Sequence, residues 1–332
     1  MRHNRRSFLN LLARSEPRTL NYWLHVNRTA MACRFEVTMR QSEEVGIAAA
    51  TEALDEIDRL ESRLTVFRDS SEVSFVNSEA AKTSVEVSSE LFDLLLLCKR
   101  LYQETDGAFD ITSGPLTRCW GFLRRRGRLP SPDEIDESRR VVGSDKMSLN
   151  ETTKSVRFVC EGMEINFGSI GKGHALDSAA ALMSSKVSAA LLNAGSSSMR
   201  AIGKGEHGDG WLVGLRNPHS KLRRLGVLRL RDCALSTSGS EEQFFEHQGQ
   251  RFSHIIDPRN GWAASKVTYV SVVAPTAAVS DALATAFFVG GRELAEQYCQ
   301  THPNVLVIML ESHAATPITV GHSSGCDGLQ DL

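Results

Sequence analysis

In several ranges of this chain, hydrophobic residues recur with the period of an α-helix. Apolar side chains recur three and four positions apart, as one face of a helix requires, at about 43–63 and 89–104. Gly107 stands just past the second range, where a glycine commonly ends a helix. Further helices are expected directly after Lys172 and at about 278–289.

Short apolar stretches bounded by polar or glycine residues predict strands. They lie at about 33–39, 190–193, 211–215, 225–230, 267–273 and 305–310. Because helices and strands do not alternate regularly, the predicted fold class is α+β, with a largely antiparallel sheet and flanking helices. Residues 130–161 are polar and broken, which predicts a surface connection, and the last dozen residues, rich in Gly, Ser and Asp, are expected to be disordered.

The run Asn166–His174 joins an extended stretch to a helix through three glycines and a lysine. Before it, Met163, Ile165 and Phe167 alternate with polar residues, which predicts a strand. Free N–H groups of the following helix favour an anion, glycine lets the backbone approach a ligand, and Lys172 adds a cation. The run is therefore a candidate phosphate cradle. The alternative is a tight turn made for packing, because strand–glycine–helix junctions are common.

Composition and charge argue against several classes of function. The 332 residues are 41% hydrophobic and 23% charged, as in an ordinary globular protein, and the formal net charge is −2. A nucleic-acid partner is not expected, because a phosphate backbone is held by an excess of Lys and Arg. The four arginines within 124–128 lack interleaved aromatic residues, which favours a solvated loop over a polyanion site. No stretch approaches the roughly 20 apolar residues of a transmembrane segment.

Cysteine usage and the N-terminus bear on the compartment. The seven cysteines form no close pair with metal-ligand spacing, and their odd number does not suit a full disulfide framework, which favours a reducing compartment. Asn4–Leu9 resembles a twin-arginine export signal, but no apolar stretch long enough for a signal peptide follows it. We therefore expect a cytoplasmic protein.

Two glycine patterns that often indicate nucleotide binding lack the context they need. Gly203–Gly208 matches the G-x-G-x-x-G spacing, but a strand-like stretch follows where a dinucleotide-binding domain requires a helix, so we expect a hairpin connection. Between Gly168 and Gly171 there are only two residues, and Lys172 is followed by glycine. That spacing does not fit a P-loop.

Asp281 and Thr285 lie four positions apart in a predicted helix, so their oxygens share one helix face. Hard cations such as Mg²⁺ prefer oxygen ligands, often one or two protein groups completed by water and substrate phosphate. The alternative is that Asp281 caps the helix and Thr285 makes a core contact. His254 stands at a strand end before a turn, where a lone histidine is more often structural than catalytic.

A set of sequence blocks connects these features. The blocks are Thr29–Ala32, Gly107–Leu116, Asn166–His174, Leu191–Gly195, Ser236–Gly239, His254–Gly261 and Asp281–Ala286. In these residues and in their order, the chain resembles the ApbE family from about Arg28 to Leu310. Members of this family are flavin transferases, which use FAD to attach FMN covalently to a threonine or serine of another protein.

The resemblance implies how the chain is divided. The family domain would occupy residues 28–312, either as one unit or as two lobes with the active site between them. An N-terminal extension (1–27) would precede this domain, and a flexible tail (313–332) would follow it.

The resemblance also implies roles for individual residues. Asp281 and Thr285 would bind Mg²⁺ through their side chains, and Ser169 through its main-chain oxygen. His254 would be the catalytic residue, acting on the phosphoryl centre or on the incoming hydroxyl. The implied FAD contacts, which include the walls around the flavin and adenine ends, are Met31, Phe67, Ala108, Phe109, Asp110, Asn166, Lys172, His254 and Ile255.

The implied reaction is a Mg²⁺-dependent transfer of FMN from FAD to a Thr or Ser hydroxyl of an acceptor flavoprotein, with release of AMP. Two alternatives remain. One is an FAD pyrophosphatase, in which water replaces the hydroxyl, and the other is a non-catalytic FAD-binding assembly protein. Self-flavinylation is not expected, since the chain lacks the family's acceptor pattern of Asp-Gly followed closely by Thr or Ser and a small residue.

Two departures from the family pattern concern the site. The glycine run usually opens with aspartate, where this chain has Asn166, and the change removes a negative charge near the diphosphate. Tighter FAD binding is the expected effect. Ser196 stands where the family usually has a second glycine after Gly195, which changes the loop expected on the adenine side.

Overall fold

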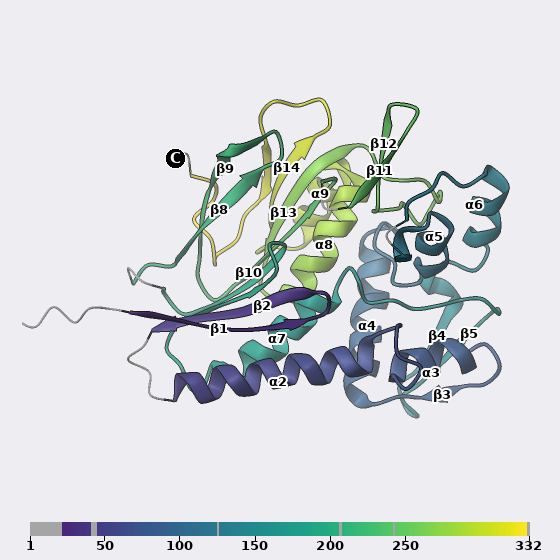
Figure 1. Ribbon diagram of the computed structural model, residues 1–332, viewed down its shortest axis with the longest axis horizontal. Helices are drawn as coiled ribbons and strands as arrows, with labels where there is room; N and C mark the ends of the chain where they lie inside the picture. Colours follow the sequence, from purple (N-terminus) through teal and green to yellow (C-terminus); the bar gives the residue numbers. More distant parts are fainter. Residues whose placement is uncertain (1–21, 41–44, 125, 206–207, 242, 331–332) are drawn as a thin grey trace, which may run out of the picture.

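The computed structural model describes residues 22–330 except 41–44, 125, 206–207 and 242. Its central feature is an eight-stranded sheet in which all neighbouring strands are antiparallel. In spatial order the strands are β1 (Trp23–Ala30), β2 (Cys33–Arg40), β6 (Ala190–Ala194), β7 (Ser198–Ile202), β10 (Ala234–Gly239), β13 (Val267–Ala274), β14 (Leu306–Glu311) and β15 (Ile318–Gly321). Helices flank this sheet (Figure 1), so the predicted α+β fold class is confirmed.

Three helices pack against one face of the large sheet. They are α2 (Gly46–Leu64), α7 (Gly171–Met183) and α8 (Ala277–Gly290). Successive side chains of a strand point to opposite faces, and Val270 and Val272 of β13 join the core beneath these helices. The helix layer therefore holds α7 and α8 side by side against the sheet (Figure 1), and these two helices carry the glycine run and the Asp281–Thr285 pair.

A two-stranded hairpin covers part of the opposite face. Its strands are β8 (Trp211–Asn217) and β9 (Ser220–Leu230), and they form a second core with Leu235, Val273 and Leu306 of the large sheet. Central strands such as β13 are thus buried on both faces, which explains why their sequences are hydrophobic almost throughout.

The remaining elements lie mainly to the right in Figure 1. They are α3 (Glu72–Glu79), β3 (Val85–Glu86), α4 (Ser89–Glu104), α5 (Gly114–Cys119), η1 (Phe122–Arg124), α6 (Pro132–Arg139), η2 (Ser144–Lys146), β4 (Met147–Asn150), β5 (Ser155–Phe158), β11 (Phe244–His247), β12 (Gln250–Ser253) and α9 (Arg292–Thr301). A third, smaller core joins α5, α6 and the segment after β12 through Trp120, Ile135 and Ile256.

Most elements predicted from the hydrophobic pattern are present. Helix α4 has the predicted bounds, α8 extends the predicted helix by one residue at each end, and α2 runs from Gly46 to Leu64. The six strands predicted from short apolar stretches are also found, with ends that differ by a few residues. Gly107 follows the end of α4 and has φ +70°, a left-handed conformation that glycine adopts without strain.

Residues 130–161 are more regular than their polar sequence predicted. They contain α6, η2, β4 and β5, so the expectation of a plain surface connection was wrong. Helix α6 starts with a capping box, in which Ser131 Oγ accepts from the Glu134 N–H and the Glu134 carboxylate accepts from the Ser131 N–H. Ile135 is its buried residue, so the helix has almost no hydrophobic period to detect.

Two local predictions also differ from the structure. Residues 163–167 alternate in burial, with Met163, Ile165 and Phe167 buried, but they belong to no strand of any sheet. Gly203–Gly208 links β7 of the large sheet to β8 of the separate hairpin, so it does not turn one hairpin back on itself. Residues 206 and 207 of that link lie outside the described residues.

Residues within 318–330 pair with the large sheet and the β8–β9 hairpin, in contrast to the flexible tail expected at 313–332. Strand β15 pairs with β14, Val227 pairs with Gln330, and Cys326 is 8% exposed. Backbone pairing needs no apolar side chain, which explains how a polar segment is held here. At the other end of the chain, β1 begins at Trp23, inside the range expected for the N-terminal extension.

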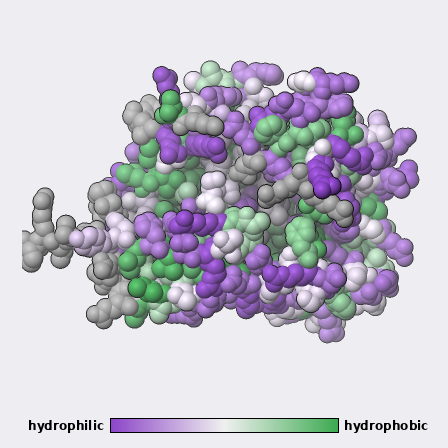
Figure 2. Space-filling view, in the orientation of Figure 1, coloured by the Kyte–Doolittle hydropathy of each residue, from purple (hydrophilic) through white to green (hydrophobic). Residues whose placement is uncertain are grey.

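Figure 2 shows hydrophilic residues spread over one face of the molecule, with hydrophobic residues in small groups between them. Arg126 and Arg128 are exposed, as expected of a solvated loop, and Arg128 forms an ion pair with Glu134.

All seven cysteines are free thiols. Across the described part of the chain, no helix combines the length and apolar character needed to cross a bilayer. The twin-arginine-like Asn4–Leu9 lies outside that part.

Candidate functional site

The start of the glycine run is held by hydrogen bonds to distant parts of the chain. Asn77 donates from Nδ2 to the Ile165 carbonyl at 3.0 Å and accepts from the Ile165 N–H at 2.8 Å. The N–H of Asn166 donates to the Ile111 carbonyl at 2.8 Å. Asn166 Oδ1 accepts from the Gly168 N–H at 2.8 Å, which forms a short turn before α7. These bonds take the place of the strand pairing that the sequence predicted.

The N-terminus of α7 is less open to an anion than predicted. The N–H of Gly171 donates to the Phe167 carbonyl at 2.6 Å, and the N–H of Gly173 donates to Asp281 Oδ2 at 3.1 Å. Two first-turn N–H groups are thus already used. A Cβ on Gly173 would lie 2.1 Å from the Ala277 carbonyl oxygen of α8. Gly173 therefore serves helix packing, which was the alternative considered for these glycines.

Helix α8 brings Asp281 and Thr285 to one cavity. Asp281 is 5% exposed; its Oδ1 accepts from Ser198 Oγ at 3.1 Å, and its Oδ2 lies 3.6 Å from Lys172 Nζ. Thr276 caps the helix, so the alternative that Asp281 acts as the cap is wrong. The pair instead faces the glycine run, with the lysine ammonium beside the carboxylate.

A carboxylate from α7 fixes the first turn of α8. Asp177 accepts from the N–H groups of Ala277 and Ala278, both at 2.8 Å, and Arg200 Nε lies 3.6 Å from its Oδ1. Burial raises the pKa of Asp177, whereas the two backbone hydrogen bonds act in the opposite direction. Because Asp177 bridges the two helices, it helps to set the position of Asp281 relative to Lys172.

The cavity between these elements has a volume of about 240 Å³. It is bounded by the glycine run, α8, the end of β10, the segment before α5 and the segment after β12. The predicted site residues that line it are Ala108, Asp110, Asn166, Ser169, Lys172, His254, Ile255, Asp281 and Thr285. The fold thus brings together most of the residues that the sequence predicted for one site.

Asp110 and Phe109 have structural roles at the edge of this cavity. Asp110 Oδ1 accepts from the Thr112 N–H and Oγ1, both at 2.8 Å, and from Ser144 Oγ at 2.7 Å. Burial raises the pKa of Asp110, and these hydrogen bonds oppose the rise. Phe109 is fully buried in the main core. Its side chain packs inside the protein, which differs from the predicted FAD contact, whereas the neighbouring Ala108 lines the cavity.

A second cavity, of about 250 Å³, adjoins the first along the glycine run. Asn166, Gly168 and Lys172 line both cavities. Met31 and Phe67, which the resemblance assigned to FAD binding, line the second one. Phe67 is 73% exposed, and an aromatic ring this open beside a cavity offers a stacking surface. Met31 has φ +47°, a strained conformation for a residue with a side chain.

His254 follows β12 and is oriented by one carbonyl group. The Gln243 oxygen accepts from the His254 N–H at 3.0 Å and contacts ring Nδ1 at 2.9 Å. Because a carbonyl only accepts, Nδ1 carries the proton and Nε2 has the free lone pair of the neutral ring. Burial lowers the pKa of His254, the Gln243 bond opposes this, and the charge of Lys172 lowers the pKa further. His254 is thus a neutral acceptor at pH 7, the form that a general base requires.

Sequence reasoning missed three residues that position the site, namely Asn77, Asp177 and Ser198. Their hydrogen bonds join positions 88, 100 and 83 residues apart. No local spacing marks such contacts, so a single sequence carries no signal for them. Among the described residues, no group of three or more His, Cys, Asp and Glu side chains could hold a metal ion.

Comparison with known proteins identifies the family. Residues 31–309 match the ApbE family. A relative from Treponema pallidum, named FAD:protein FMN transferase, is 31% identical over 292 residues, which cover 82% of this chain and 80% of the relative. A relative of the same name from Escherichia coli K12 is 30% identical and covers 74% of this chain and 70% of its own length.

The fold agrees with this match. The crystal structure of the ApbE protein from Thermotoga maritima superposes with a TM-score of 0.81 at 26% identity, covering 89% of this chain and 96% of that chain. Family match, sequence relatives and fold thus extend over most of the same residues. The chain belongs to the ApbE family.

Proposed function

We propose that this chain is a Mg²⁺-dependent FAD:protein FMN transferase, which moves FMN from FAD to a Thr or Ser hydroxyl of an acceptor flavoprotein and releases AMP. Relatives at 31% and 30% identity carry the name FAD:protein FMN transferase. For this chain's own chemistry, one observation carries the proposal. Lys172, Asp281 and Thr285 line one cavity, and a second cavity adjoins it along the glycine run.

Two adjoining cavities suit a dinucleotide. A dinucleotide has two flat ring systems, and ligand sites are typically concave and mostly apolar with a few placed polar groups. Met31 and Phe67 provide apolar and aromatic contacts for the flavin ring in the second cavity, and Ile255 provides an apolar contact for adenine in the first. The diphosphate would then lie at the shared wall formed by Asn166 and Lys172.

The oxygen donors of the first cavity fit Mg²⁺. The side chains of Asp281 and Thr285 and the main-chain oxygen of Ser169 would hold the ion, since Mg²⁺ prefers oxygen and keeps several positions for water and phosphate. A set with one carboxylate holds the ion best when diphosphate oxygens complete it. Bound there, Mg²⁺ supplies positive charge that stabilises the phosphoryl oxygens during transfer.

The protein's own groups would perform the remaining tasks. Lys172 would offset negative charge on the phosphoryl oxygens as the acceptor hydroxyl attacks the FMN-side phosphorus. Nε2 of His254 would accept the hydroxyl proton while the bond to the bridging oxygen breaks and AMP leaves with that oxygen. A general base contributes about 10²- to 10⁴-fold in rate, so replacing His254 should slow the reaction strongly without abolishing it.

Asn166 is expected to influence how tightly FAD is bound. Its side-chain oxygen is used by the Gly168 N–H at 2.8 Å, and its amide carries no charge. An aspartate at this position would place a negative charge beside the diphosphate. We therefore propose that Asn166→Asp weakens FAD binding, more strongly at low ionic strength, because like charges repel less when salt screens them.

Product analysis tests the proposed function. The full chain is incubated with FAD, MgCl₂ and synthetic peptides that each contain one Thr or Ser, and AMP, free FMN and peptide-bound flavin are quantified by mass spectrometry. Equal amounts of AMP and peptide-bound FMN support the transferase. AMP with free FMN would instead identify a pyrophosphatase, and FAD binding without cleavage a non-catalytic assembly protein. As a control, Asp281→Ala should end Mg²⁺-dependent cleavage while leaving much of the FAD affinity.

A further inference from the structure

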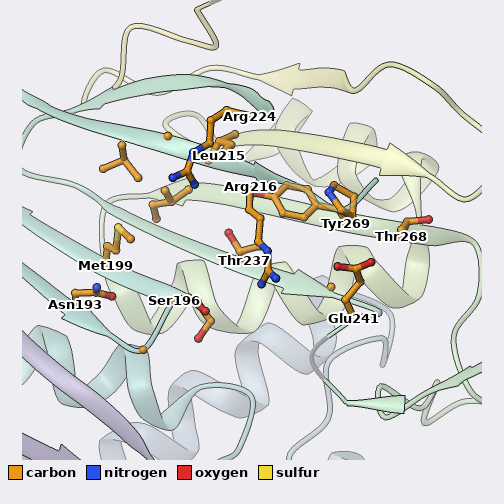
Figure 3. A pocket seen from close by; sticks show the side chains of 17 residues that line it. Asn193, Ser196, Met199, Leu215, Arg216, Arg224, Thr237, Glu241, Thr268 and Tyr269 are labelled. Atoms are coloured by element: carbon orange, nitrogen blue, oxygen red, sulfur yellow. The ribbon is translucent and has the colours of Figure 1, made fainter. Parts of the chain in front are cut away.

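A third cavity, of about 240 Å³, lies between the β8–β9 hairpin and the large sheet (Figure 3). Its lining includes Gly195 and Ser196, whose loop was expected on the adenine side, but none of the residues predicted to bind FAD or Mg²⁺ directly. Its apolar surface comes from Met199, Val213, Leu215 and Leu235, which belong to strands on both sides of the space. With the two ends of FAD assigned to the other two cavities, this one remains for a different ligand.

The third cavity continues into the candidate active site. Ser197, Thr237 and Gly239 line both the third cavity and the one that contains Lys172 and His254. A chain lying in the third cavity could therefore extend one of its side chains past Ser197, Thr237 and Gly239 toward His254 in the first cavity. This continuity suits the second substrate of a two-substrate reaction.

The wall shared by the two cavities contains a strand edge that pairs with no other strand among the described residues. Strand β10 pairs with β13 from Ala234 to Gly239, but with β7 only from Ala234 to Ser236. The N–H of Thr237 still bonds to the Ser197 carbonyl at 2.7 Å, and that of Ser240 bonds toward β13 at 3.1 Å.

Backbone groups alternate in direction along a strand. Gly239 lies two positions after Thr237, so its N–H and C=O point to the side that β7 no longer covers. An extended segment of another chain can pair with such an edge through main-chain hydrogen bonds, while alternate side chains enter adjacent pockets.

The charge around the third cavity is mainly positive. Arg216 and Arg224 project from β8 and β9 (Figure 3), and both are exposed. Glu241 is the acidic residue of the lining. Two arginines against one glutamate favour an acidic ligand, and arginine suits a carboxylate because its planar fork can bind both oxygens.

We propose that the third cavity and the open edge of β10 bind the acceptor protein, as an extended segment with an acidic residue close to the Thr or Ser that receives FMN. This inference rests on the proposed function. The segment pairs with the backbone of Gly239, places its acidic side chain at Arg216 and Arg224, and directs its hydroxyl toward His254. Apolar side chains of the segment fill the space next to Leu215 and Leu235.

Peptide binding tests the proposal without requiring catalysis. The probes are fluorescein-labelled 12-residue peptides with a central Thr and a single Asp or Lys at each other position in turn, in an Ala, Val and Gly background. Fluorescence anisotropy with the full chain, FAD and MgCl₂ should show Asp peptides binding about tenfold more tightly than their Lys counterparts at one or two positions. Equal affinity of the two sets, or no binding, would overturn the proposal.

A matched pair of variants separates the cavity from general surface charge. Arg224→Glu should remove the preference for Asp peptides, and the double change with Arg216→Glu should reverse it. Arg223→Glu makes the same charge change at the neighbouring exposed position, which is outside the cavity lining, and should leave the preference unchanged. An equal loss of preference in the Arg223 and Arg224 variants would refute the site.

Two further measurements separate backbone pairing with β10 from charge recognition by the arginines, and peptide binding from FMN transfer. N-methylation of the peptide backbone amides, one position at a time, should abolish binding at the amide whose N–H donates to the Gly239 carbonyl and leave binding nearly unchanged at the two neighbouring amides, which point away from β10. Loss at every position or at none would exclude strand pairing. FMN transfer to the same peptides should follow the binding order. If peptide binding depends on the arginines but no FMN is transferred, the docking site is supported and the proposed function is refuted. If FMN is transferred equally well in the Arg216 and Arg224 variants, the proposed function is supported and the docking site is refuted.

Discussion

Replacing Gly173 by alanine should separate the two helices that form the site. The new Cβ would lie 2.1 Å from the Ala277 carbonyl oxygen, 2.4 Å from the Ala277 carbonyl carbon and 2.7 Å from Ala278 N. These are backbone atoms, so no side-chain rotation can relieve the clash. Restoring an ordinary contact of 3.4 Å requires a shift of about 1.3 Å between α7 and α8.

Both stability and catalysis should respond to this shift. Overpacking of this kind typically costs about 1–3 kcal/mol in the free energy of unfolding. The same movement displaces Asp281 from Lys172 Nζ, now 3.6 Å away, and a displacement of about 1 Å in a catalytic site can cost roughly 10²-fold in rate. The Gly173→Ala protein should therefore lose far more Mg²⁺-dependent FAD cleavage than its lower stability explains.

Urea unfolding and FAD cleavage measured on the folded fraction test this prediction. Gly171→Ala is the matched control for stability, because a Cβ there would meet the Phe167 Cβ at 3.5 Å, an ordinary contact. That variant should unfold within about 1 kcal/mol of the parent. If Gly173→Ala unfolds like the parent and cleaves FAD at the parent rate, the close approach of α7 and α8 is not what positions the site.

Three other outcomes follow from the same geometry. Asp281→Asn keeps an oxygen that accepts from Ser198 but loses the negative charge that would hold Mg²⁺. Calorimetry should therefore find FAD binding largely independent of Mg²⁺, and retained Mg²⁺ dependence would contradict the ligand assignment. His254 must be neutral to act as a base, and burial lowers its pKa from the ordinary value, so the rate should be level near pH 7 and fall as the pH drops through that lowered pKa. An acidic fall in rate that persists in His254→Gln would exclude this origin. Asp177→Ala removes two hydrogen bonds at the start of α8 and should cost about 1–2 kcal/mol in urea unfolding, whereas an unchanged midpoint would show that Asp177 does not support the helix.

The parts of the fold that are governed by local pattern could be predicted from the sequence. Helix α4 has a hydrophobic face, a Ser88 cap and Gly107 beyond its end, and each of these is a local sequence signal. The four-residue spacing of Asp281 and Thr285 likewise predicted that both would face one site. The family resemblance supplied what spacing did not, namely which distant segments meet around them.

The rest depends on contacts between distant segments. Nothing near Gly173 indicates that the backbone of α8 lies against it, so the sequence left open whether this glycine makes room for a ligand or serves packing. The same holds for Phe109, whose position in a site-forming block predicted a cofactor contact although the side chain is buried in the core. Helix α6 was missed for a different reason, since its one buried residue, Ile135, gives no hydrophobic period.

The position of the metal ion decides whether Asp281 and Thr285 form its site beside the diphosphate of FAD. Crystals of the full chain grown with FAD and Mn²⁺ in place of Mg²⁺ would locate the ion by its anomalous scattering. One peak is expected at about 2.0–2.3 Å from the Asp281 carboxylate and the Thr285 hydroxyl, in contact with a diphosphate oxygen beside Lys172. A peak elsewhere, or FAD bound with its diphosphate away from the Asp281–Thr285 pair, would contradict this assignment.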